Sequence, residues 1–138
     1  MKTSVELFVR GEDALGECPL WDERNGLLYW VDSRAPSIHR LDPATGAQST
    51  RQLPSLVGSI GLRQRGGLVA ALQTGLYTLD SLDAPLTPVA QPEADLPDNR
   101  FNDGKCDRRG RFWAGTMNDK RRDPRSEEHT SELQSPMY

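Results

Sequence analysis

The sequence has little of what marks a zinc-binding, secreted or membrane protein. Its 138 residues include two histidines and two distant cysteines, Cys18 and Cys106, without CxxC spacing. A structural zinc site therefore has no support, and we expect free thiols. No apolar run approaches the roughly 18 residues that a membrane-spanning helix needs. The first residues, MKTSVELFVRGED, lack an apolar stretch of signal-peptide length. We therefore expect a cytoplasmic protein with no membrane partner.

The chain also lacks a dominant charge. Seventeen basic and twenty acidic residues give a formal net charge of -3. This balance offers no electrostatic reason to bind nucleic acid or an anionic membrane surface. We interpret the basic run at residues 120–125 as a solvated loop.

Short apolar runs between glycines and prolines predict an all-β fold, since no stretch keeps a helical apolar period over three turns. Three polar turns end in Gly26, Gly67 and Gly110, which lie 41 and 43 residues apart. A period of about forty residues with several strands favours propeller blades, while a β-sandwich is the alternative. A closed ring has about four to eight blades, and roughly three are visible, so we expect part of a ring. Strands are predicted at residues 27–31, 37–41, 59–63, 68–72, 75–79, 105–107 and 111–115.

The last fourteen residues, 125–138, do not continue this pattern. Residues 125–136 read RSEEHTSELQSP, which resembles the translation of a common sequencing-library adapter. The alternative is a native disordered terminus. We predict that residues 125–138 are a non-native, disordered tail, and that residues 1–124 are the N-terminal part of a β-propeller domain.

Two polar stretches are candidates for chemistry. Glu17 lies in GECPLWD, between a glycine and an expected strand, where it could contact a metal ion or simply face water. Arg100, Asn102 and Asp103 lie in RFNDGK, just before a core-type strand. Arginine offers a fork of donors for an oxygen-rich ligand, and asparagine is both donor and acceptor. The alternative is an Asn-Asp-Gly turn with solvated charges.

Together, GECPLWD, LYWVD, IHRLD, RFNDGK and GRFWAGTM resemble the gluconolactonase, regucalcin and luciferin-regenerating-enzyme family across residues 1–124. The resemblance implies a six-bladed β-propeller, of which about the first half is present. It also implies one divalent cation (Ca²⁺, Zn²⁺, Mn²⁺ or Mg²⁺) in the central channel.

The resemblance also implies roles for individual residues. Glu17 matches a metal ligand, while Arg100 and Asn102 match residues that hold substrate oxygens and Asp103 matches their acidic neighbour. The other two ligands, an Asn and an Asp that is also the candidate general base, lie in later blades outside this chain. Cys18 departs from the small residue usual at its position.

The resemblance implies a lactone hydrolase that acts on sugar lactones with its metal ion. The alternative is a calcium-binding or regulatory propeller without significant catalysis. A third possibility, a propeller that binds proteins through its blade faces, is disfavoured by the channel-type residues. The 138-residue chain by itself is expected to be inactive, because it carries one metal ligand of three.

The origin of the tail can be tested on DNA. We predict that the codons for residues 125–136 match the adapter sequence and that independently sequenced genomic DNA diverges near residue 124. Genomic DNA that encodes the same residues with other codons would show that the tail is native.

Overall fold

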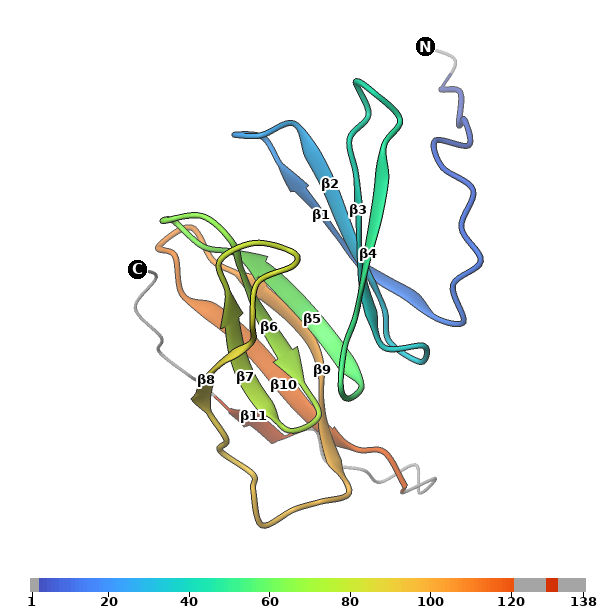
Figure 1. Cartoon of the computed structure of the whole chain (residues 1–138). Helices are drawn as coiled ribbons and strands as arrows, with labels where there is room; N and C mark the ends of the chain where they lie inside the picture. The colour runs from blue at the N-terminus through green and yellow to red at the C-terminus, as the bar shows by residue number, and fades with distance from the viewer. Residues whose placement is uncertain (1–2, 121–128, 132–138) are drawn as a thin grey trace.

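The computed structural model describes residues 3–120 and 129–131, which form β-strands and no helix (Figure 1). The strands are β1 Gly16–Asp22, β2 Leu27–Asp32, β3 Ser37–Leu41, β4 Gln48–Gln52, β5 Val57–Leu62, β6 Leu68–Leu72, β7 Gly75–Leu79, β8 Thr87–Ala90, β9 Asn99–Cys106, β10 Phe112–Asn118 and β11 His129–Ser131. The prediction of an all-β fold is confirmed. Within these residues, no helix is long and apolar enough to cross a membrane.

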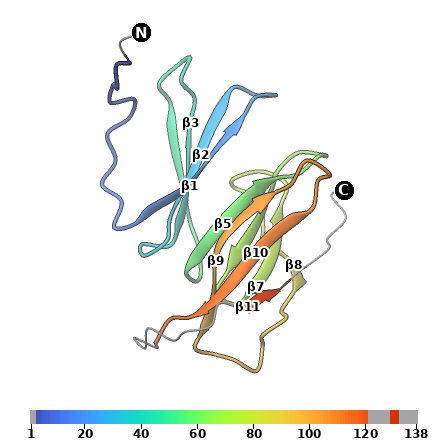
Figure 2. The same cartoon turned by 180° about the vertical axis from the view of Figure 1, so that it is seen from behind.

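The strands form three antiparallel sheets, which we call blades. Blade 1 has the order β1-β2-β3-β4, blade 2 the order β5-β6-β7-β8, and blade 3 the order β9-β10-β11. The first strands of the blades lie side by side, with β5 packed against both β1 and β9 (Figure 2). These inner strands carry every residue predicted for the site.

Blade 3 reaches into the segment that was predicted to be a non-native tail. Strand β11 pairs with β10, so that Gly115 lies opposite Thr130. The rest of residues 125–138 lies outside the described residues, as do residues 121–125 of the basic run.

The predicted turns and most of the apolar strands are confirmed. Gly26, Gly67 and Gly110 all have positive φ, at 66°, 72° and 80°. Strands β3, β6 and β7 have the predicted bounds. The unpredicted strands β4 and β8 are largely exposed, because they are the outermost strands of their blades and bury little apolar surface. Strand β4 is polar, whereas β8 is short and contains Pro88.

Apolar side chains fill the spaces on both sides of blade 2. One cluster joins blades 1 and 2, and a smaller one joins blades 2 and 3. Blade 2 is thus buried on two faces, which its nearly continuous apolar strands predict. The buried members of the larger cluster are Tyr29, Val31, Ile38, Leu53, Val57, Ile60, Leu68, Ala70, Leu72, Leu79 and Leu82, and those of the smaller cluster are Ala71, Leu76, Phe101, Phe112 and Ala114.

Each inner strand has a β-bulge near its beginning. In β1, the register shifts between Glu17 and Leu20, and in β5 it shifts around Gly58. In β9, the bulge falls at residues 102–103, opposite Gly115 of β10. The first unpaired residue of each bulge is Cys18, Gly58 or Asn102, and each lies four residues before the end of its strand, at Asp22, Leu62 and Cys106. A bulge changes the direction of the side chains next to it, and the blades repeat it at equivalent positions.

Gly58 lets blade 3 approach blade 2 closely. A Cβ atom at this position would overlap the backbone carbonyls of Asn102 and Phe101. The backbone of β9 therefore occupies the space that a side chain of β5 would need.

We predict that Gly58→Ala destabilises the protein by about 1–3 kcal/mol, because the new methyl group forces β5 and β9 apart. Gly115→Ala is the matched control, since a Cβ there would meet no atom within 4 Å. The measurement is the free energy of unfolding in urea. Equal stability of the two variants would show that the close approach is not a constraint.

Asp32 fastens the start of blade 1 to the turn after β2. Its side chain is buried, and its carboxylate accepts backbone N–H bonds at 2.6 Å from Ala14, 3.1 Å from Leu15, 3.0 Å from Arg34 and 2.9 Å from Ala35. Burial alone would raise the pKa of Asp32, but these four donors together lower the pKa below its ordinary value.

Asp32 should therefore stabilise the fold above about pH 4 and lose this effect as the pH falls further, because the unfolded chain takes up the proton first. We predict that Asp32→Asn lowers the free energy of unfolding at pH 7 by about 1–3 kcal/mol. We also predict that its urea midpoint depends less on pH below about 4 than that of the wild type. Parallel pH profiles for variant and wild type would contradict this assignment.

Candidate functional site

Strands β1 and β9 carry the four residues that the sequence marked as a site. Glu17 lies at the bulge of β1, and Arg100, Asn102 and Asp103 lie in β9. The three β9 residues were expected to precede a strand, but they lie within one, because the strand begins at Asn99. The Asn-Asp-Gly sequence forms a bulge here and not a turn between strands.

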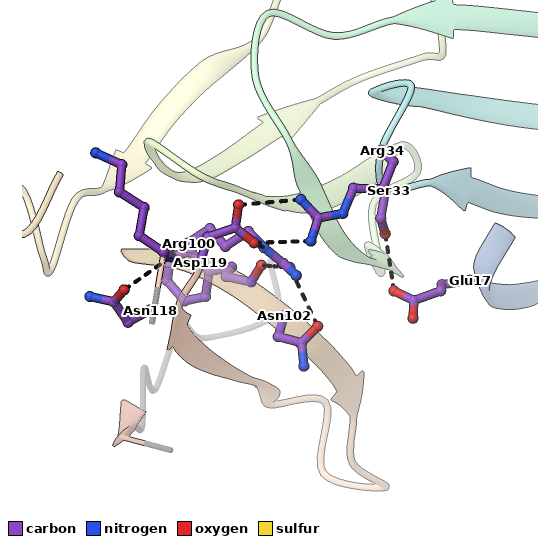
Figure 3. Close-up of polar contacts among 9 residues, drawn as sticks. Glu17, Ser33, Arg34, Arg100, Asn102, Asn118 and Asp119 are labelled. Atoms are coloured by element: carbon purple, nitrogen blue, oxygen red, sulfur yellow. Dashed lines mark hydrogen bonds and ion pairs between the residues drawn. The ribbon is translucent and has the colours of Figure 1, made fainter. Parts of the chain in front are cut away.

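Glu17 is half-buried and bonded to the neighbouring turn of its own blade. The hydroxyl of Ser33 donates to Glu17 Oε2 at 3.0 Å (Figure 3). Ser33 is itself buried, so this bond limits the directions that the carboxylate can take. One carboxylate oxygen of Glu17 is thus held in place by the fold.

Cys18 fixes the bulge that follows Glu17. Its φ of 53° is the only positive value for a non-glycine residue in the described part of the chain. The thiol lies 3.4 Å from the backbone N of Ile60, which donates to it, and 3.5 Å from the backbone O of Ile60. Burial raises the pKa of Cys18. Both cysteines are free thiols, as predicted, and Cys18 joins β1 to β5 beside the candidate ligand.

Arg100 is a buried cation with fixed partners. It is 6% exposed, and its Nε donates to Asp119 Oδ1 at 2.7 Å. One terminal nitrogen, Nη1, donates to the backbone O of Phe101 at 3.2 Å and makes a long contact of 3.5 Å with Asn102 Oδ1. The side chains of Arg100 and Asn102 therefore lie next to each other on β9, and their binding of a shared ligand stays a prediction.

Asp119 and Arg34 belong to this cluster, and sequence reasoning missed both. Arg34, in the turn after β2, donates from Nη1 to Asp119 Oδ2 at 3.2 Å and from Nη2 to Oδ1 at 3.1 Å. The hydrogen bond from Arg100, more than that from Arg34, lowers the pKa of Asp119. Arg34 and Asp119 are 85 residues apart, so no local pattern could have paired them.

Asp103 is separate from the Arg100 cluster. It is exposed, and its Oδ1 accepts a bond from the backbone N of Gly104 at 2.8 Å. It is not among the residues bonded to Arg100. Its position beside Asn102 in the bulge keeps it next to the candidate site, without a direct contact to the arginine.

The candidate residues border different hollows in the described structure. Glu17 lines one of about 310 Å³, Arg100 lines one of about 300 Å³, and Asp103 lines one of about 530 Å³. The largest lies among β1, β5 and β9, and both cysteines line it. Glu17, Arg100 and Asp103 thus border three separate hollows and do not share one of them.

The described residues do not fit a metal ion by themselves. No group of three or more His, Cys, Asp or Glu side chains among them is arranged to hold one. Glu17 offers oxygen ligands that Ca²⁺ and Mg²⁺ favour, but a stable site needs more of them. A metal site would require ligands in addition to Glu17.

Comparison with known proteins agrees with the predicted resemblance. A family model described as "SMP-30/Gluconolactonase/LRE-like region" matches residues 15–135. The chain is 44% identical over 117 residues to a 6-deoxy-6-sulfogluconolactonase of Pseudomonas putida, covering 85% of this chain and 40% of that protein. It is 39% identical over 113 residues to the regucalcin of Xenopus laevis, covering 82% of this chain and 38% of that one.

Solved structures show the same fold. A calcium-binding protein, regucalcin, from Agrobacterium tumefaciens matches with a TM-score of 0.73 and 32% identity, covering 78% of this chain and 37% of that one. A luciferin-regenerating enzyme matches with a TM-score of 0.76 and 26% identity, covering 89% and 47%. The prediction of a partial β-propeller is confirmed.

The chain spans about 40% of the length of the curated relatives it matches. The family model nevertheless covers most of its residues, and the similarity of sequence and of fold points the same way. The chain therefore belongs to the SMP-30/gluconolactonase/LRE-like family.

Proposed function

We propose that this chain is part of a metal-dependent sugar-lactone hydrolase in which Arg100 and Asn102 bind the oxygen atoms of the lactone. The observation that carries the proposal is the buried Arg100 guanidinium beside Asn102, on a bulged inner strand. Relatives with lactonase names, including a putative sugar lactone lactonase of Bacillus subtilis at 38% identity, support the substrate class.

A sugar lactone presents a carbonyl oxygen, a ring oxygen and hydroxyl groups that both donate and accept. Guanidinium N–H groups suit the acceptors, and the Asn102 amide can both donate and accept. Because Arg100 is buried, its interactions with a bound ligand gain strength from the low local dielectric. Asp103 is the acidic neighbour at the exposed side of the same bulge and could accept from a lactone hydroxyl.

In this proposal, Glu17 supplies one carboxylate ligand of a divalent cation, Ca²⁺, Zn²⁺, Mn²⁺ or Mg²⁺. The Agrobacterium regucalcin of similar fold is described as a calcium-binding protein, which supports a divalent ion. In this proposal the remaining ligands and the general base come from later blades of the full-length protein, as the family resemblance implies. The described residues hold no group of three or more His, Cys, Asp or Glu side chains arranged for a metal ion. We accordingly propose that the 138-residue chain alone does not hydrolyse lactones.

One other function is supported by a specific observation. Several relatives are named regucalcin, at 35–39% identity, and the Agrobacterium structure is described by its calcium binding. A calcium-binding or regulatory propeller without significant catalysis would use the same Glu17.

The full reading frame that contains this chain provides the test. We expect it to hydrolyse gluconolactone, to lose activity in EDTA, and to regain it with a divalent cation. Glu17→Gln should lower kcat/KM by more than about 100-fold, because even groups outside the metal's ligand shell are worth about 10–100-fold. Glu23→Gln, at an exposed turn of the same blade, is the control and should retain full activity.

Two results would contradict the proposal. A full-length protein that binds Ca²⁺ but hydrolyses no sugar lactone would favour the regulatory alternative. Lactone hydrolysis by the 138-residue chain alone would show that the described residues suffice for the site.

A further inference from the structure

We propose that Asp119 is a positioning residue that orients the Arg100 guanidinium toward the substrate, and that Arg34 holds Asp119 from blade 1. The inference rests on the proposed function, because it assumes that Arg100 contacts the lactone. Figure 3 shows the carboxylate of Asp119 between the two guanidinium groups. Neither Asp119 nor Arg34 contacts Glu17 among the bonds of the described residues.

The orientation of Arg100 depends on two different kinds of contact. Its Nη1 donates to the backbone O of Phe101, which is part of its own strand. Its Nε donates to Asp119 Oδ1 at 2.7 Å, the shortest bond that it makes. Because an arginine side chain loses rotamer entropy when its orientation is fixed, a second fixed point is needed to hold one orientation of the group. Asp119 supplies that point.

Asp119 is itself held at both ends. Its backbone N donates to the backbone O of Asp98 at 2.9 Å. Each of its two carboxylate oxygens accepts a hydrogen bond from one terminal nitrogen of Arg34. This bidentate geometry fixes the orientation of the carboxylate. The turn that carries Arg34 is anchored in turn by Asp32, which accepts the backbone N–H of Arg34 at 3.0 Å. Through these bonds, blade 1 helps to fix the orientation of Arg100 in blade 3.

The charges are suited to ligand binding. The carboxylate of Asp119 pairs with the guanidinium groups of both Arg34 and Arg100. These three side chains together therefore carry a net charge of one positive unit. Arg34 is 47% exposed and Asp119 is 22% exposed, so water screens their pair more than it screens Arg100 at 6%. The Arg100 pair is the better shielded one, and its loss would leave a buried guanidinium without its carboxylate.

If the ion pairs of Asp119 only held the blades together, substitutions of Asp119 would have different effects. Such a purely structural role would predict that Asp119 variants lower the melting temperature and the amount of active enzyme. A positioning residue instead changes the affinity for a ligand that Arg100 binds, and a longer carboxylate can restore it.

The test compares Asp119→Asn, Asp119→Glu and Arg34→Gln in the full-length enzyme with gluconolactone as the substrate. For Asp119→Asn we expect KM to rise about tenfold with kcat within about threefold, because uniform binding is lost. Asp119→Glu should return KM to within about threefold of the wild type, and Arg34→Gln should raise it about threefold. The matched control is Asp80→Asn, which removes the exposed ion pair between Arg63 and Asp80 in blade 2 and should change neither constant.

Two measurements separate this inference from the proposed function. In ¹⁵N NMR spectra, the Arg100 Nε–H should be protected from exchange in the wild type and lose protection in Asp119→Asn. Titration of the same proteins with gluconate, the hydrolysis product, reports ligand binding even if no hydrolysis occurs. Weaker gluconate binding by Asp119→Asn supports the inference whether or not the wild type is a lactonase.

An unchanged KM and gluconate affinity in Asp119→Asn would overturn the inference. It would also be overturned if Asp119→Asn and Asp119→Glu lowered the melting temperature and kcat equally, since that pattern indicates a structural connection only. A wild type that binds gluconate but hydrolyses no lactone would overturn the proposed function and leave the positioning by Asp119 standing.

Discussion

The close packing of β5 against β9 is the constraint on which the candidate site depends. Gly58 and Gly104 leave no room for side chains at this contact, because a Cβ at Gly58 would overlap the Asn102 carbonyl and one at Gly104 would lie 2.5 Å from Ser59 Oγ. Apolar clusters on both faces of blade 2 hold the strands together. The backbone of β9 is therefore placed by packing, before any polar contact of the site is considered.

The inner strands β1, β5 and β9 each contain a bulge, and the candidate residues Glu17, Asn102 and Asp103 lie at or next to these bulges. Cys18 and Asn102 begin the bulges of blades 1 and 3, and Gly58 takes that position in blade 2. Glu17 lies directly before the bulge of blade 1. The blade repeat thus offers the same location several times. In blades 1 and 3 this position carries the side chains of Cys18 and Asn102, and in blade 2 it has none, because the neighbouring backbone fills the space.

Electrostatic contacts then join parts of the chain that the apolar clusters do not. The Arg34–Asp119–Arg100 cluster links blade 1 with blade 3, while the bond between Ser33 and Glu17 stays within blade 1. Each carboxylate has partners that keep it oriented. Arg34, which is half-exposed in the turn after β2, therefore contacts the carboxylate that orients the buried Arg100 in blade 3.

Local patterns in the sequence determined the turns, the apolar strands and the identity of Glu17, Arg100 and Asn102 as candidates. Glycine at turn ends and short apolar runs report directly on backbone conformation and burial, so these features can be read without coordinates. The outer strands β4 and β8 had no such signal, since they bury little. The tertiary structure alone decided that Asp119 pairs with Arg34 and Arg100, and that Asp103 stands apart. Those contacts join residues up to 85 positions apart, and only the packing of one blade on the next brings them within hydrogen-bonding distance.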